Sequence, residues 1–138
     1  MKIDSPEAME SLGVQIGSQL KAGDVVLLNG DLGAGKTTLV RGIGKALGID
    51  QVTSPTFVIS KIYPGVIPLV HVDAYRLIGN ELALFDDLDL ESRIPQSITI
   101  IEWGSGFVER LDQAFIEIDI EFGGETSDRI VHLKGLEI

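Results

Sequence analysis

The chain has 138 residues, 44% of them apolar, which is enough for one domain (1–138) with a sizeable hydrophobic core. It has no cysteine, which excludes disulfides, thiolate chemistry and cysteine zinc sites. Its longest stretch without a charged residue, 62–72, is far shorter than the ~20 residues of a membrane-spanning helix. The N-terminus has Asp4, Glu7 and Glu10 where a signal peptide has basic and then apolar residues, so we expect a cytoplasmic protein.

The net charge of −10 comes entirely from the second part of the chain. Residues 1–80 have seven acidic and seven basic side chains, whereas residues 81–138 have fourteen acidic and four basic ones. This acidity disfavours direct binding of a nucleic-acid backbone. The acidic surface is either a solvated face that aids solubility or a docking face for a basic protein partner.

The first 48 residues predict a helix, a strand, a glycine-rich loop and a second helix. Ser5-Pro6-Glu7 is typical of a helix start, and apolar residues recur at helical spacing from Met9 to Leu20 before Gly23 ends the pattern. Residues 24–29 are an apolar run typical of a strand buried on both faces. Apolar residues from Leu39 to Leu47 again have helical spacing.

The rest of the chain predicts mostly strands. The expected strands are 57–63, 67–72, 97–101, 116–122 and 129–134. The turn signal Pro64-Gly65 predicts antiparallel pairing of the first two, and the Gly123-Gly124 region predicts pairing of the last two. Residues 80–92 are expected to form a helical and irregular acidic segment.

A phosphate-binding loop is the strongest motif. Residues 30–37, Gly-Asp-Leu-Gly-Ala-Gly-Lys-Thr, match the pattern G-x-x-x-x-G-K-[ST] completely, between a predicted strand and a predicted helix. Small residues let backbone N–H groups surround phosphate oxygens at the N-terminus of the helix. Lys36 would neutralise the β- and γ-phosphates, and the Thr37 hydroxyl would ligate Mg²⁺. The chain has no Asn-Lys-x-Asp pattern for guanine, so ATP is the expected nucleotide.

The loop and its neighbours predict an α/β fold of the P-loop NTPase type. We expect three layers and a mixed sheet with a parallel core around the loop and antiparallel C-terminal strands. Such sites need a carboxylate at the end of a neighbouring strand to hold the metal, and Asp73 and Glu102 each directly follow a predicted buried strand. His71 alternates with Asp73 and is either structural or part of the same site.

Four motifs together resemble the bacterial TsaE family, also called YjeE: G-D-L-G-A-G-K-T-T at 30–38, S-P-T-F at 54–57, H-V-D-A-Y-R-L at 71–77 and I-E-W at 101–103. Their order and spacing match over roughly residues 5–135. Proteins of this family are small P-loop ATPases needed for the N6-threonylcarbamoyl modification of adenosine 37 in tRNA. The resemblance implies ATP and Mg²⁺ as cofactors and TsaD and TsaB homologues as partners, with tRNA contacted only indirectly and no membrane.

The resemblance also implies roles for individual residues. Thr37 and Glu102 would ligate Mg²⁺, and Asp73 would orient water or the metal's water shell, acting as a catalytic residue with Lys36. Thr56 would sense the γ-phosphate within the switch at 54–57. The residues it implies for nucleotide binding are Asp31, Leu32, Gly33, Ala34, Gly35, Lys36, Thr37, Thr38 and Thr56.

Other residues bear less directly on the chemistry. Tyr75 and Trp103 would pack beside the site. The sequence departs from the family pattern at Met9, where Thr is common, and at Gly104 and Gly106. Neither departure touches the phosphate chemistry.

Two other functions are compatible with a phosphate loop. The main alternative is a small-molecule or nucleotide kinase, but such enzymes need arginines over the transferred phosphate, and Arg93 is the only arginine between residues 77 and 109. A nucleotide-binding adaptor that does not hydrolyse is disfavoured because Asp73 and Glu102 are both present. The scarcity of suitably placed arginines also predicts slow hydrolysis by the isolated chain.

Overall fold

The computed structural model describes residues 1–31, 33–50, 52, 60–73, 93–102, 114–123 and 128–137. The elements in chain order are β1 (Lys2–Ile3), α1 (Pro6–Gln19), β2 (Val25–Gly30), α2 (Lys36–Ala46), β3 (Ser60–Tyr63), β4 (Leu69–Asp73), the 3₁₀ helix η2 (Ile94–Gln96), β5 (Ile98–Glu102), β6 (Ile116–Phe122) and β7 (Arg129–Lys134). The seven strands form one mixed sheet in the order β1-β7-β6-β2-β5-β4-β3. Neither of the α-helices in this part of the chain is long and apolar enough to cross a membrane.

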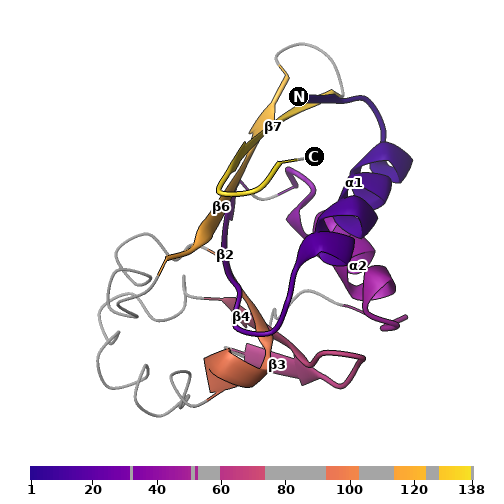
Figure 1. Cartoon of the computed structure of the whole chain (residues 1–138). Coiled ribbons are helices and arrows are strands. Elements are labelled where there is room, and N and C mark those ends of the chain that lie inside the picture. The colour runs from indigo at the N-terminus through magenta and orange to yellow at the C-terminus, as the bar shows by residue number, and fades with distance from the viewer. Residues whose placement is uncertain are drawn as a thin grey trace.

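The strand pairing confirms the predicted α/β class and mixed sheet. Strands β6, β2, β5 and β4 are parallel neighbours, while β7 pairs antiparallel with β6 and β3 with β4, around the Pro64-Gly65 turn. The short strand β1, which has no periodicity to reveal it, pairs antiparallel with β7. Both α-helices lie on one face of the sheet (Figure 1). Among the described residues, α-helices cover only this face of the sheet, so the prediction of a third layer concerns residues outside those described.

Helix α1 begins as expected and ends earlier than expected. Ser5 is its N-cap, and the Ser5 hydroxyl accepts a hydrogen bond of 3.0 Å from the Ala8 N–H. The helix ends at Gln19 because Leu20 is already extended, and the Lys21 N–H donates to the Asp24 carboxylate at 2.9 Å. This local bond forms a turn that leads directly into β2, which replaces the last helical turn suggested by the apolar spacing.

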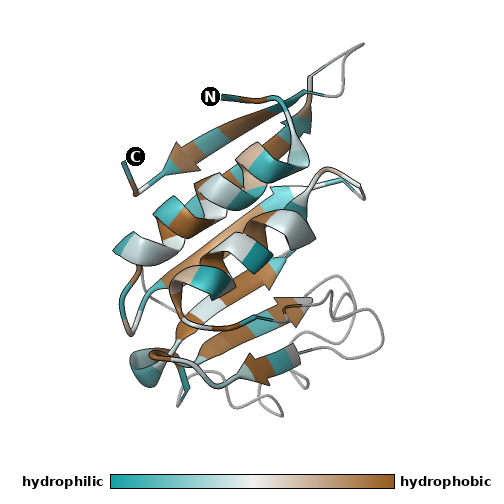
Figure 2. Ribbon diagram, turned by 90° about the vertical axis from the view of Figure 1, so that its right-hand side faces the viewer, coloured by the Kyte–Doolittle hydropathy of each residue, from teal (hydrophilic) through white to brown (hydrophobic). Residues whose placement is uncertain are grey.

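The core lies between the sheet and the two helices. Viewed from the helix side, the strands are largely hydrophobic, and the outward surfaces of the helices carry many polar residues (Figure 2). The core residues from the strands include Val26, Leu28, Ile98, Ile100 and Ile118, and those from the helices include Ile16, Leu39 and Ile43. Strand residues whose side chains point to the other face of the sheet are equally buried: Val25, Leu27, Val70, Val72 and Ile101. The parallel core therefore fits the buried strands predicted from the apolar runs.

The two helices pack with their backbones in close contact. A Cβ atom at Gly42 would lie 2.1 Å from the Glu10 carbonyl oxygen, and one at Gly13 would lie 2.2 Å from that of Leu39. Lys45 of α2 also forms an ion pair with Glu10 of α1. Only glycine fits at positions 13 and 42, so α1 directly supports the helix that begins at the phosphate loop.

Candidate nucleotide-binding site

The glycine-rich loop connects the carboxyl end of β2 to the first turn of α2. Gly33 and Gly35 have φ angles of +81° and +112°, in the left-handed region that favours glycine. The Ala34 N–H donates to the Asp31 carbonyl oxygen at 3.0 Å, which closes a turn within the loop. Gly35 is the N-cap of α2 and has no side chain to occupy the helix N-terminus. The first N–H groups of α2 thus border the loop, as in anion-binding helix termini.

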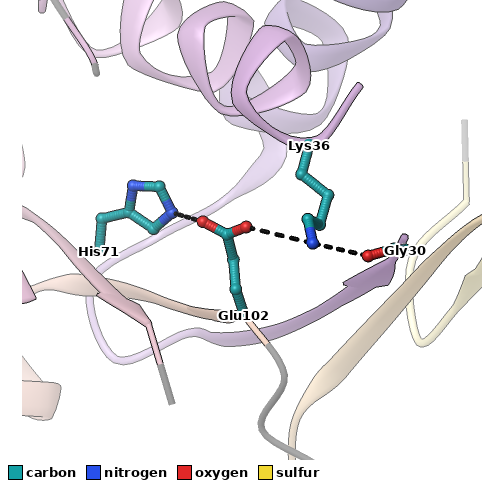
Figure 3. A network of polar contacts seen from close by, with 4 residues as sticks. All are labelled: Gly30, Lys36, His71 and Glu102. Atoms are coloured by element: carbon teal, nitrogen blue, oxygen red, sulfur yellow. Dashed lines mark hydrogen bonds and ion pairs between the residues drawn. The ribbon is translucent and has the colours of Figure 1, made fainter. Parts of the chain in front are cut away.

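Lys36 is the first residue of α2, and its ammonium group lies at the end of the sheet. Its Nζ donates to the Gly30 carbonyl oxygen at 2.6 Å and lies 3.7 Å from Glu102 Oε1 (Figure 3). The Lys36 residue is only 7% exposed. A buried ammonium is costly without polar partners, and the Gly30 carbonyl and Glu102 carboxylate supply them.

Glu102 connects Lys36 to a buried histidine. While Glu102 Oε1 faces Lys36, its other oxygen, Oε2, contacts His71 Nε2 in a short hydrogen bond (Figure 3). His71 is completely buried, and its Nδ1 has no hydrogen-bond partner among the described residues. The carboxylate can only accept, so the imidazole proton is assigned to Nε2. His71 therefore fixes one carboxylate oxygen and leaves the other oriented toward Lys36.

The sheet register brings the candidate residues to one edge. In the parallel pairing, Glu102 of β5 is the partner of Leu28 on β2 and of Asp73 on β4. The carboxyl ends of three adjacent strands therefore meet beside the loop, where open α/β sheets commonly bind ligands. The structure thus brings Lys36, Glu102 and the backbone of Asp73 together, as the positions of these residues at strand ends suggested.

Some of the other predicted site residues lie in the described loop and helix, and the rest lie outside the described residues. Thr37 and Thr38 lie half-buried in the first turn of α2, and Asp31 and Gly33 lie exposed in the loop. Leu32, Thr56, Tyr75 and Trp103 lie outside the described residues.

Arg129 contacts the loop, and the sequence pattern did not indicate this role. Its Nε donates to the Ala34 carbonyl oxygen at 3.2 Å, and its Nη2 to that of Gly33 at 3.4 Å. Its guanidinium carbon lies 4.5 Å from the centre of the Phe122 ring. Because this contact joins residues about 95 positions apart, only the folded sheet reveals it.

A cavity of about 220 Å³ adjoins the loop on the side of Arg129. It is lined by residues 3–6 and Met9 at the start of the chain, Gly33, Ala34, Gly35 and Thr38 of the loop and α2, and Arg129 of β7. Its walls include both polar and apolar side chains. This arrangement suits the nucleoside part of a ligand whose phosphates lie in the loop.

Comparisons with known proteins agree with this fold. The family model for "Threonylcarbamoyl adenosine biosynthesis protein TsaE" matches residues 3–131. A tRNA threonylcarbamoyladenosine biosynthesis protein TsaE from Streptomyces coelicolor is 47% identical over 91% of this chain and 87% of its own length. The protein of the same name from Bacillus subtilis is 38% identical over 91% of this chain and 79% of its own length. The crystal structure of Bacillus subtilis YdiB is similar, with a TM-score of 0.75, 36% identity and coverage of 95% of this chain and 80% of that one. The chain belongs to the TsaE family.

Proposed function

We propose that this protein binds and hydrolyses ATP with Mg²⁺ and serves in the biosynthesis of tRNA threonylcarbamoyladenosine, together with TsaD and TsaB homologues. The observation that carries the ATPase proposal is the contact of Lys36, in a complete phosphate loop, with the buried carboxylate of Glu102. The names of the relatives support the tRNA-modification role.

The loop and the adjoining cavity suit different parts of ATP. The phosphates bind to the loop, where Lys36 and the N–H groups at the start of α2 neutralise their charge. The nucleoside then extends toward the cavity lined by Met9, Thr38 and Arg129. Thr56 contributes to sensing the γ-phosphate.

The oxygen donors near Lys36 fit Mg²⁺. Glu102 Oε1 and the Thr37 hydroxyl, which belongs to the residue after Lys36, would hold the ion. The described residues contain no group of three His, Cys, Asp or Glu side chains able to hold a metal. Mg²⁺ usually combines one or two carboxylates with substrate phosphates, and Glu102 would be such a carboxylate. When bound, Mg²⁺ neutralises charge that develops on the β- and γ-phosphates.

Lys36 must change partners when the nucleotide binds. To donate to phosphate oxygens, its ammonium leaves the Gly30 carbonyl oxygen and Glu102 Oε1. Leaving a buried carboxylate without a cation costs several kcal/mol. Lys36 therefore neutralises Glu102 until another cation replaces it, and this couples the binding of ATP to that of the metal. His71 retains Glu102 Oε2 throughout.

Hydrolysis requires a water molecule aligned with the γ-phosphate. Asp73, paired in register with Glu102, orients this water or the metal's water shell. Lys36 stabilises the charge on the transferred phosphoryl group.

Nucleotide titrations of the wild type and Lys36→Ala, with and without Mg²⁺, test the binding site. The loss of charge-assisted hydrogen bonds to phosphate should weaken ATP binding about 10–100-fold. Lys45→Ala is the matched control, because Lys45 lies on the same helix and pairs with Glu10, away from the loop. Equal ATP affinity for the wild type and Lys36→Ala would contradict the proposed site.

A further inference from the structure

Arg129 is attached to the phosphate loop by several interactions. Besides the bonds to the Ala34 and Gly33 carbonyl oxygens, its Nη1 donates to the Asp128 carbonyl oxygen at 3.1 Å. Phe122, the cross-strand partner of Arg129 in the β6–β7 pairing, places its ring under the guanidinium. The planar, forked guanidinium is therefore fixed by its own hairpin before it reaches the loop.

The bonds from Arg129 fix the orientation of two peptide groups. In a trans peptide, the carbonyl of one residue and the N–H of the next point in opposite directions. With the Gly33 carbonyl held by Arg129, the Ala34 N–H is directed inward, where it donates to the Asp31 carbonyl oxygen. With the Ala34 carbonyl held, the Gly35 N–H is likewise directed away from Arg129.

This orientation matters because the loop is intrinsically flexible. Positions 30, 33 and 35 are glycines, which have the largest backbone entropy to lose. A ligand that had to order the loop would lose affinity, whereas a loop that is already ordered binds without this cost. Two hydrogen bonds from a fixed cation provide such order.

We propose that Arg129 is a positioning residue that holds the phosphate loop in its binding conformation and so strengthens the binding of polyphosphates. The proposal rests on the proposed function, since it assumes that the loop binds the phosphates of ATP. Arg129 acts on the phosphates through the loop backbone, and this effect is separate from its place in the wall of the cavity proposed for the nucleoside.

Two probes separate the phosphate part from the nucleoside part: ATP and inorganic tripolyphosphate, each titrated against wild type and Arg129→Gln. We expect the affinity for tripolyphosphate to fall about 10–100-fold and that for ATP to fall by at least the same factor, because Arg129 also lines the cavity proposed for the nucleoside. Lys134→Gln is the matched control, because Lys134 lies on the same strand, carries the same charge and pairs with Glu117 away from the loop. A loss confined to ATP would overturn the proposal, as would unchanged affinity for both probes.

Hydrogen exchange of the ligand-free protein gives a readout that does not depend on nucleotide binding. In Arg129→Gln, the amides of residues 33–36 should exchange several-fold faster than in the wild type and in Lys134→Gln. If the wild type bound neither probe, the proposed function would fail, while this exchange would still decide whether Arg129 orders the loop. Exchange equal to that of the wild type would overturn the proposal.

A second substitution covers the case in which Arg129→Gln does not fold. Arg129→Lys keeps the charge and the packing on Phe122 but lacks the fork that reaches both carbonyl oxygens. Its loop amides should exchange faster than in the wild type, and both probes should bind more weakly. Behaviour equal to that of the wild type in both measurements would contradict the role of the forked contact.

Discussion

In the proposed function, the carboxylate of Glu102 would serve the site both with and without bound nucleotide. One oxygen contacts His71 and the other faces Lys36, so these two contacts fix the orientation of the carboxylate. His71 and Lys36 thus have different tasks. His71 keeps the carboxylate in place, whereas Lys36 neutralises it and, in the proposed function, would be released to the phosphates.

This division predicts opposite effects of Glu102→Gln in two buffers. Without Mg²⁺, ATP should bind about as tightly as to the wild type or up to ~10-fold more tightly, because Lys36 loses its anionic competitor and the phosphates lose a repelling charge. With Mg²⁺, the gain in affinity that the metal gives the wild type should disappear. Calorimetric titration in both buffers measures this difference. A variant that lost ATP affinity equally in the two buffers would argue against the exchange of partners at Lys36.

The sequence alone could identify those site residues that occupy a fixed position in a motif or directly follow a predicted strand. Lys36 follows from the loop pattern, and Asp73 and Glu102 follow from their positions after apolar runs. Alternation could place His71 on a face of its strand, but it could not identify Glu102 as the hydrogen-bond partner. Arg129 could not be found in this way, because its bonds to Gly33 and Ala34 depend on tertiary structure.

At the scale of elements, the contact between α1 and α2 determines where the loop lies. The close approach at Gly13 and Gly42 leaves no room for a side chain, and neither glycine belongs to a recognisable motif. Helical periodicity could predict the two helices and their apolar faces, but it carries no information on the distance between their axes. The same limit applies to the end of α1, which a local bond from Lys21 to Asp24 decides.

The contact makes Gly42→Ala a test of the packing. Alanine favours a helix over glycine by roughly 1 kcal/mol, but its Cβ would lie 2.1 Å from a backbone oxygen, which no rotamer change can relieve. The clash should prevail, with a net loss of about 1–3 kcal/mol in the free energy of unfolding. Urea unfolding measures it, with Ser11→Ala on the exposed face of α1 as the control, expected within ~0.5 kcal/mol of the wild type. Unchanged or higher stability of Gly42→Ala would show that the helices are not so close.

At the scale of the whole molecule, the parallel pairing of β6 with β2 brings the C-terminal hairpin beside the loop. The sequence could predict the β6–β7 pairing from alternation and the glycines between them. It could not predict the neighbour of β6, because the same apolar residues suit an edge or a central strand. This placement brings Arg129 and the adjoining cavity to the phosphate loop.

The acidic charge of the C-terminal part is partly balanced on β6. Glu117 lies 3.5 Å from Lys134 Nζ, and Asp119 accepts a hydrogen bond of 2.8 Å from Asn29. Glu121 lies 3.5 Å from His132. These polar neighbours, of which Lys134 is a cation, favour a solvated face for this strand over a docking face for a basic partner.

The arginines in the described part of the chain are poorly placed to assist phosphoryl transfer. Arg41 donates to the Val52 carbonyl oxygen, Arg129 to the loop carbonyls, and Arg93 precedes β5, at the end of the strand opposite Glu102. A cation supplied by a partner can accelerate such reactions by ~10³–10⁵-fold. The placement of the arginines in this part of the chain supports the expectation that the isolated chain hydrolyses ATP slowly and that its productive cycle requires the partners.

The most direct test of this account is phosphate release from ATP by the chain alone and with purified TsaD and TsaB homologues and tRNA. Alone, the wild type should turn over well below about one ATP per second, and the partners should raise this rate. Asp73→Ala serves as the matched variant: it should bind ATP as the wild type does and release no phosphate under either condition. Fast release by the wild type alone, unchanged by the partners, would contradict the account.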